Sequence, residues 1–445
     1  MGCLLTVALL LLAPTLQASA DETDWDAILG LSQGSWVEPG DELVWRTDLP
    51  AALDEARETG RPLFITLRCL PCKQCADFDK DVLEGGPRLS PLLRRFVTVR
   101  LTDARQLDLV LLPAAGFQDF DLSWWGWFLS PERDVYGVFG GRDEVSDTTR
   151  ISEEALARTM ERVLDHHHDP RRLRWDLDGP GSPAGAHAIF PTDLPAYGSW
   201  SRQYPAAAAE ACLHCHQVGE LLRQPALDEG RFDKQRDLDV WPFPENAGFR
   251  VDRDDGLLVT DVTADGPAHA AGLRAGDQLR VAADRLLFGQ ADLRGVLHRE
   301  ADPSGTIAVQ WLRDGERHEG QLELAEGWRS TDLTWRMSVS QGNVGAAPGF
   351  AWPLAGKHPA VPEDQLCIEP WFGQTPQEWP AYAAGLRPSH RIVAVDGERP
   401  ALSGRPFLVW FRARYDPGDE VVWTVLEDGE ERELRYHLPQ PGVGD

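Results

Sequence analysis

Residues 48–84 read DLPAALDEARETGRPLFITLRCLPCKQCADFDKDVLE, and the order of elements in this stretch decides the fold of the N-terminal part of the chain. Asp48 can cap a helix that ends at Gly60, and the apolar run that follows predicts a short buried strand. The strand leads into Cys69-Leu-Pro-Cys72, after which apolar residues recur at helical spacing. The first thiol is therefore expected at a helix N-terminus, whose partial positive charge stabilises a thiolate.

This stretch resembles the thioredoxin superfamily, in which a Cys-x-Pro-Cys-Lys motif follows a central strand. The resemblance implies a thioredoxin-like domain over residues 36–172, with Cys69 as the exposed nucleophile and Cys72 as the buried resolving thiol. Cys75 lies one helical turn beyond Cys72 and also allows a Cys72/Cys75 pair. Three interpretations stay open here: a redox-active dithiol, a metal site made by the sulfurs, and buried thiols without a redox role.

One segment departs from the thioredoxin pattern. The family places a cis-proline just before its β-hairpin, whereas residues 122–127 read LSWWGW and contain no proline. The dithiol face is therefore expected to be more open than in the family. The three tryptophans of this segment either belong to the core or shield the sulfur site, and we expect them in the core; they are Trp124, Trp125 and Trp127.

A second cysteine pair lies in Cys212-Leu-His-Cys215-His216. Two cysteines three apart with a histidine after the second form the pattern by which c-type haem is attached covalently. Each thiol can add across a haem vinyl group, and His216 can then supply an axial nitrogen to the iron. A structural zinc site and a pair of thiols without a cofactor are the alternatives, although no second ligand pair follows at zinc-finger spacing.

The haem-attachment segment is expected to be short and mainly helical, with one helix over about 206–222 that carries the motif. A linker rich in Gly and Pro, residues 173–185, precedes it, and the segment itself spans 186–245. A segment of this size needs a neighbouring domain to cover one face of a haem. The sixth ligand stays open: His187 is the first candidate, Met337 the second, and an empty position the third.

The N-terminus and the charge of the chain indicate where it acts. Residues 1–20 contain a short apolar run and end in Ala-Ser-Ala, as a secretory signal peptide does. No later stretch reaches the roughly 20 apolar residues of a membrane span. We therefore expect a periplasmic or otherwise exported protein, a location that suits both covalent haem and disulfides. The net charge of −27 argues against nucleic acid as a partner.

The second half of the chain predicts two units of one kind. Residues 266–277 read GPAHAAGLRAGD, which resembles the PDZ domain of the bacterial type, and we place this domain at 246–326. An extended peptide adds to such a domain as a strand, with its terminal carboxylate at a Gly-Phe turn. The peptide-binding residues are then Ala247, Gly248 and Phe249. Alternatively, the unit serves only as internal packing against the haem or redox domain.

The chain then repeats this pattern. Residues 383–397 match 270–283 in phase, and the Leu-Glu-Asp-Gly sequence at 426–429 echoes Leu-Arg-Asp-Gly at 312–315. A second PDZ-like domain over 340–440 is the economical interpretation. The predicted fold class is thus multidomain, α/β plus mainly β: a thioredoxin-like domain, a short helical haem-attachment segment and two PDZ-like domains.

Taken together, these motifs resemble the bacterial family of thioredoxin-like and PDZ domain-containing (seleno)proteins. The resemblance implies redox chemistry at the CxPC motif and leaves the reaction open, either a thiol-disulfide oxidoreductase or an electron carrier. The expected function is thiol and electron transfer by a dithiol and a haem c, with a redox partner protein and with peptide or protein tails bound by the PDZ units. The alternatives are a periplasmic PDZ scaffold or adaptor with a redox-inert thioredoxin-like domain, and a metal-delivery protein.

Overall fold

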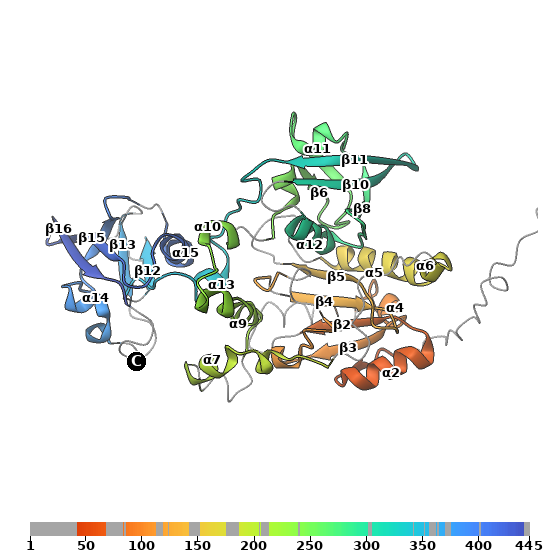
Figure 1. Ribbon diagram of the computed structural model, residues 1–445, viewed down its shortest axis with the longest axis horizontal. Coiled ribbons are helices and arrows are strands. Elements are labelled where there is room, and N and C mark those ends of the chain that lie inside the picture. Colours follow the sequence, from red (N-terminus) through yellow and green to blue (C-terminus); the bar gives the residue numbers. More distant parts are fainter. Residues whose placement is uncertain are drawn as a thin grey trace, which may run out of the picture.

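The computed structural model describes residues 42–67, 83, 86–112, 119–122, 124–141, 152–174, 187–203, 205, 213–238, 241–300, 305–340, 342–350, 352–355, 362, 365–369, 375–399 and 402–439. These residues form four parts: an N-terminal α/β unit (42–174), a helical segment (187–238), a first β-rich unit (241–324) and a second β-rich unit (342–439) (Figure 1). Within the described residues, no helix has both the length and the apolarity needed to span a membrane.

The N-terminal α/β unit is built on one mixed sheet. Its strand order is β1-β3-β2-β4-β5, with β1 and β2 parallel to β3 and the last two strands antiparallel. The strands are β1 (Trp45–Arg46), β2 (Leu63–Leu67), β3 (Val97–Leu101), β4 (Trp124–Leu129) and β5 (Val135–Gly141). The helices around them are α2 (Leu49–Thr59), α4 (Ser90–Leu93), η2 (Ala104–Gln106), α5 (Glu153–His167) and α6 (Arg171–Arg174).

Local sequence signals set the helix boundaries of this unit. The Asp48 carboxylate accepts a hydrogen bond from Ala51 N and caps α2, which ends where Gly60 adopts a φ of 65°. Ser152 caps α5 in the same way, by accepting from Ala155 N. The predicted ends of α2 are confirmed, because each depends on residues within one turn of the boundary.

The two faces of the sheet carry separate hydrophobic cores. Trp125 and Trp127, two residues apart on β4, face one core together with α2, whereas Trp124 faces the other core together with α5. All three indoles are at most 1% exposed. The expectation that they are core residues is confirmed.

The helical segment differs from its predicted form in where its main helix runs. The segment contains η3 (Pro191–Asp193), α7 (Tyr197–Gln203), α9 (Cys215–Asp228) and α10 (Lys234–Asp237). The sequence predicted a helix over about 206–222, whereas α9 starts inside the motif, at Cys215. The Gln217 side chain fixes this start, since its oxygen accepts a hydrogen bond from His214 N at 2.8 Å.

The first β-rich unit consists of short strands and helices and closes with a long hairpin. It comprises η4 (Pro244–Ala247), β6 (Phe249–Val251), β7 (Val259–Val262), α11 (Pro267–Ala270), β8 (Gln278–Ala282), β9 (Arg285–Leu286), α12 (Gln290–Glu300), β10 (Gly305–Arg313) and β11 (Glu316–Leu324). The buried carboxylate of Asp277 accepts from Arg274 N and pairs with Arg313, with both distances at 2.7 Å. The aspartate of the Gly-Asp motif therefore fixes the turn into β8.

The second β-rich unit repeats this order. It comprises β12 (Trp352–Ala355), β13 (Leu366–Glu369), η5 (Pro376–Glu378), α14 (Pro380–Ala383), β14 (Arg391–Val395), α15 (Gly404–Arg414), β15 (Glu420–Glu427) and β16 (Glu430–His437). Both units close with a hairpin whose two turn residues have positive φ, Asp314-Gly315 in the first and Asp428-Gly429 in the second. The internal repeat seen in the sequence is thus a repeat of structure.

The long helix of each β-rich unit packs against another part of the chain. Helix α12 lies on β5, the edge strand of the N-terminal sheet, where Asp292 Oδ1 accepts a hydrogen bond from Val138 N at 2.9 Å (Figure 1). Helix α15 packs against α13 (Met337–Ser340), which also contacts α9. Both helices therefore hold the parts of the chain together.

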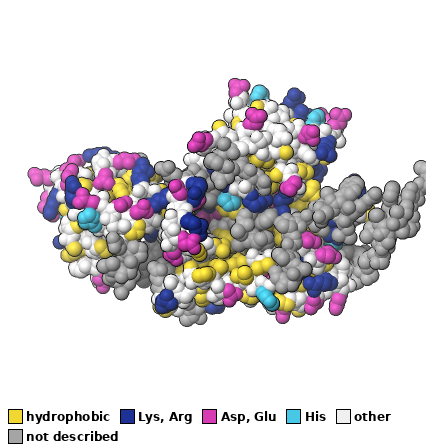
Figure 2. Space-filling view, in the orientation of Figure 1, with side chains coloured by type: hydrophobic (Ala, Val, Ile, Leu, Met, Phe, Trp, Pro, Cys, Tyr) yellow, Lys and Arg dark blue, Asp and Glu magenta, His cyan; other side chains and the backbone are white. Residues whose placement is uncertain are grey.

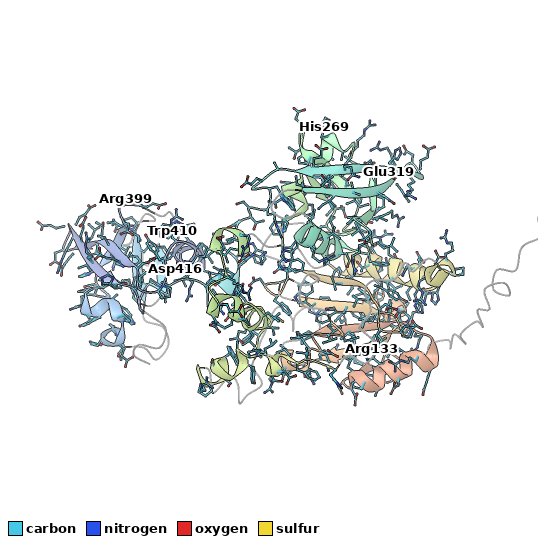
Figure 3. The ribbon with its side chains drawn as sticks, in the orientation of Figure 1. Arg133, His269, Glu319, Arg399, Trp410 and Asp416 are labelled. Carbon is cyan, nitrogen blue, oxygen red and sulfur yellow. The ribbon has the colours of Figure 1, made fainter. Side chains whose placement is uncertain are left out.

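An ion pair at the surface completes the junction of the second unit. Lys234 Nζ lies 2.6 Å from the carboxylate of Asp416, which Figure 3 labels just beyond α15, and 2.8 Å from the carbonyl oxygen of Tyr415. Acidic side chains also spread over the outer face of this unit in Figure 2, in keeping with the net charge of −27.

Candidate functional site

The structure describes only part of the predicted sulfur chemistry. Cys69, Cys72, Cys75 and Cys212 lie outside the described residues, whereas Cys215 is described as the first residue of α9 and is buried. Strand β2 ends two residues before the first of these cysteines. The structure therefore places residues next to the two motifs, and Cys215 and His216 of the second motif.

Residues next to both motifs belong to one hydrophobic cluster. Leu67, the last residue of β2, shares this cluster with Leu213 and Cys215 at the start of α9. Trp125, which pairs with Leu67 across β2 and β4, belongs to it as well. The start of α9 and the end of β2 thus belong to the same hydrophobic cluster.

The ring of His216 is held by a carboxylate on its own helix. His216 Nδ1 lies 2.9 Å from Oε1 of Glu220, one turn further along α9, and each side chain is 11% exposed. When Nδ1–H donates to the carboxylate, Nε2 is the nitrogen with a lone pair for a metal ion. His214 stacks on His216 with ring centroids 5.6 Å apart, and burial together with the His216 charge lowers the pKa of His214.

These residues fit an axially ligated haem. A metal-bound histidine in proteins normally donates its other ring N–H to a carboxylate or carbonyl, and His216 has such an acceptor. The buried Cys215 immediately precedes it at the start of the helix. Within the described residues, no group of three or more His, Cys, Asp and Glu side chains is arranged to hold a metal ion.

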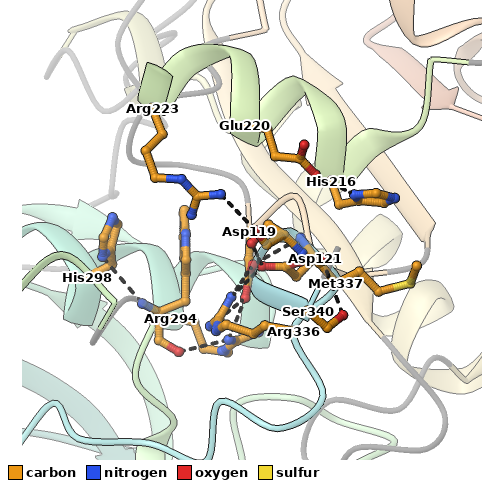
Figure 4. A network of polar contacts seen from close by, with 12 residues as sticks. Asp119, Asp121, His216, Glu220, Arg223, Arg294, His298, Arg336, Met337 and Ser340 are labelled. Atoms are coloured by element: carbon orange, nitrogen blue, oxygen red, sulfur yellow. Dashed lines mark hydrogen bonds and ion pairs between the residues drawn. The ribbon is translucent and has the colours of Figure 1, made fainter. Parts of the chain in front are cut away.

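The structure brings Met337 to this helix. Met337 begins α13, which packs against α9, and Figure 4 shows the side chains of Met337 and His216 extending in the same direction. Its neighbours Arg336 and Ser338 are both buried and both hydrogen-bonded to Asp121, so the backbone at Met337 is fixed. By contrast, His187 is exposed where the helical segment begins.

A buried charge cluster lies beside this site and was not foreseen from the sequence. We define it as Asp119, Asp121, Arg223, Arg294 and Arg336 (Figure 4). Arg336 Nη1 lies 2.9 Å from Asp119 and 3.1 Å from Asp121, and Arg294 Nη2 lies 3.0 Å from Asp119. The two acids come from the N-terminal unit, and the arginines come from the helical segment, the first β-rich unit and the stretch that links the two β-rich units, so the cluster joins them.

Burial and charge act in opposite directions on the central acid of the cluster. Burial alone raises the pKa of Asp119, but the nearby charges of Arg336 and Arg294 outweigh this effect and hold the pKa below its ordinary value. Asp119 is therefore ionised at neutral pH and balances the two guanidinium groups.

Arg223 links the cluster to the helix that carries His216. Its Nη2 donates to the carbonyl oxygen of Ser338 at 2.9 Å, and its Nε donates to the side-chain oxygen of Asn343 at 3.2 Å. Asn343 in turn donates to the carbonyl oxygen of Glu220 at 3.1 Å. The segment around α13 therefore contacts α9 near Glu220, whose carboxylate is the hydrogen-bond partner of His216.

The predicted peptide-binding residues lie together at the turn from η4 into β6. Ala247 and Phe249 are at most 1% exposed, and Gly248 adopts a φ of 83°. The Gly248 carbonyl oxygen accepts a hydrogen bond from Thr263 N at 2.8 Å. In this structure all three residues belong to the interior of the first β-rich unit.

Part of helix α12 is covered by the chain itself. Trp241 stacks on His298 with ring centroids 4.4 Å apart, and its carbonyl oxygen accepts a hydrogen bond from Arg294 at 2.8 Å. Burial and the charge of Arg329 lower the pKa of His298 to about 4, so this ring is neutral at pH 7. This part of α12 thus contacts the segment that leads into the unit.

Comparisons with known proteins identify two domains. Residues 44–116 match a family model described as thioredoxin-like, and residues 247–324 match the model of the PDZ domain. The chain therefore contains a thioredoxin-like domain and a PDZ domain. Comparison with curated proteins found no match.

One solved structure that the chain is similar to is an HtrA-type protease, AlgW with a decapeptide. The similarity has 15% sequence identity and a TM-score of 0.19, and it covers 31% of this chain. The aligned part spans 43% of the protease chain.

Proposed function

We propose that the protein is an exported redox protein that combines the CxPC dithiol of its thioredoxin-like domain with a covalently bound haem c. In this proposal Cys69 and Cys72 are the redox pair, Cys212 and Cys215 hold the haem, and His216 is an axial ligand. The observation that carries it is the shared hydrophobic cluster, which places Cys215 in one core with the end of strand β2. Strand β2, which precedes the dithiol, and helix α9, which begins at the second cysteine of the haem motif, thus contribute to the same hydrophobic cluster.

The surroundings of His216 support this proposal. Glu220 accepts the Nδ1–H bond, which leaves Nε2 as the ligating nitrogen, and Cys215 is buried at the start of α9. A haem held there supplies a one-electron carrier, whereas oxidation of a dithiol to a disulfide releases two electrons and two protons. Because of this mismatch the proposal includes a separate redox partner protein.

Met337 is favoured over His187 as the second axial ligand. The contact of α13 with α9 and the fixed backbone on either side of Met337 support this choice. His187 is exposed at the start of the segment, and no described contact ties it to α9.

The PDZ domain is proposed to bind the tail of a peptide or protein partner, and the second β-rich unit is proposed to be a second PDZ-like domain. The repeated order of elements supports this assignment of the second unit. The PDZ match also favours a second candidate function, a periplasmic adaptor with a redox-inert thioredoxin-like domain. Thiol titration separates the two, because an inert domain shows an ordinary Cys69 thiol and does not reduce insulin disulfides.

The decisive experiment is to produce the full chain in bacteria that mature c-type cytochromes and to examine the purified protein. We expect a visible haem spectrum, and a haem stain that stays on the polypeptide in a denaturing gel. Covalent thioether bonds survive denaturation, whereas a haem held only through its iron is lost. A colourless protein from such cells would overturn the haem proposal and leave the adaptor function.

Met337→Ala tests the assignment of the second axial ligand. We expect the variant to keep its covalent haem but to lose the thioether-to-iron band near the red end of the oxidised spectrum. We also expect its reduction potential to fall, because a Met ligand raises the potential. His187→Ala is the matched control and should leave both properties unchanged. If only the His187 variant changes the spectrum, the assignment of Met337 is wrong.

A further inference from the structure

The carboxyl group of Glu220 is buried. The side chains of Glu220 and His216 are each 11% exposed. A His–Glu pair at i, i+4 on an exposed helix stabilises the helix only slightly, whereas a buried carboxylate needs compensating partners. The contacts that surround Glu220 therefore need to be identified.

The chain holds Glu220 from two sides. Asn343 donates to its backbone carbonyl oxygen, and the positive charge of Arg223 is close enough to interact with the carboxylate. The backbone at Gly342 packs directly against it, since a Cβ added there would lie 3.2 Å from Glu220 Cδ and 1.8 Å from the carbonyl oxygen of Ser338. Only glycine fits at this position, and the segment that closes over α9 thereby fixes the carboxylate.

We propose that Glu220 is a positioning residue for His216: it accepts the Nδ1–H bond, fixes the ring tautomer and orientation, and increases the basicity of Nε2. This inference rests on the proposed haem. A more basic axial nitrogen stabilises the oxidised iron more than the reduced iron, so Glu220 lowers the reduction potential of the site. The function of the buried pair is thus to set how readily the site gives up an electron.

Arg223 and the charge cluster make this role possible. Arg223 supplies the positive charge near Glu220, and its hydrogen bonds to Ser338 and Asn343 tie that charge to the segment anchored on Asp121. The position of the carboxylate therefore depends on the thioredoxin-like domain, which contributes Asp121, as well as on α9.

The test compares Glu220→Gln with the wild-type protein by redox titration and by resonance Raman spectroscopy of the iron–histidine bond. Gln keeps the shape and an acceptor oxygen but removes the charge. We expect unchanged haem content, a weaker iron–histidine bond, and an equilibrium constant for reduction at least tenfold higher, which is about 59 mV for one electron. Asp228→Asn is the matched control, because it makes the same change on an exposed side chain of α9 and should shift the constant less than twofold.

A potential of Glu220→Gln equal to that of the wild type would overturn the inference while leaving the haem proposal intact. If the wild type carries no haem, the haem proposal fails, and the positioning role is tested in the same protein by ¹⁵N NMR of His216. A single Nδ1–H tautomer is expected there, and Glu220→Met should convert it to a mixture. The same tautomer in both proteins would show that Glu220 does not position the ring.

Discussion

Replacing Cys212 and Cys215 together by serine is expected to remove all haem stain from the denatured polypeptide. The two sulfurs are the only atoms in the motif that can form thioether bonds, and His216 alone holds a haem only through its iron. The measurement is haem stain per mole of protein on a denaturing gel, together with the visible spectrum of the purified variant. We expect the stain to fall from one haem per chain to background.

Cys367→Ser is the matched control for this experiment. Cys367 is also buried, on β13 of the second β-rich unit, and lies outside the motif. Its variant should stain like the wild type, so general damage to a buried thiol is separated from loss of attachment. Stain that persists in the double serine variant would contradict attachment through these cysteines.

The parts of the fold that the sequence predicted depend on short-range signals. Asp48 and Gly60 bound α2 because a cap and a left-handed terminal residue act within one turn. The repeat was visible because both units use the same turn chemistry, an Asp-Gly pair at positive φ between two strands. Such features need no knowledge of distant contacts.

The contacts between the parts could not be read in this way. Asp119 and Arg336 are more than two hundred positions apart, and neither lies in a pattern that marks it as buried. An aspartate and an arginine are mostly exposed in proteins, so the sequence favoured solvent for both. The start of α9 was also misplaced, because a side-chain cap from Gln217 decides it and no apolar periodicity marks that cap.

The candidate site was predictable only in its ligands. His216 follows from the motif, but the carboxylate that holds its ring is simply a glutamate one turn along a helix, where glutamates are common. Its role emerges from burial, which depends on the segment around Gly342. The proposed ligands Cys212, Cys215 and His216 lie within five residues of one another. The residues that bury Glu220 and so fix the ring of His216 lie more than one hundred positions away.

Both β-rich units use their long helix to bind another part of the chain. Asp292 of α12 satisfies the outward N–H of Val138 on the edge strand β5, and Arg412 of α15 donates to the carbonyl oxygen of Gly342 at 2.7 Å. Helices α12 and α15 are therefore both tied by described contacts to the parts of the chain that pack around α9.

Asp119→Asn is expected to destabilise the protein by about 3–5 kcal/mol, because it leaves Arg336 and Arg294 buried without their shared counter-charge. The free energy of unfolding is measured by urea denaturation followed by tryptophan fluorescence. Arg399→Ala is the control: it breaks an exposed ion pair with Glu431, and such pairs contribute about 0–1 kcal/mol. A loss as small as that of the control would show that the buried charge cluster does not stabilise the fold.

The dependence of this loss on pH identifies its cause. The folded-state pKa of Asp119 is lowered, so its contribution is fully present above the unfolded pKa of about 3.9 and is lost as the pH falls through the folded value. The difference in free energy of unfolding between wild type and Asp119→Asn should therefore stay constant from neutral pH to about pH 5 and shrink below about pH 4.

Adding Arg336→Met to Asp119→Asn should recover part of the stability at neutral pH, since the double change removes both charges of a buried pair. Strictly additive losses would mean that the two side chains stabilise the junction independently and not as an ion pair.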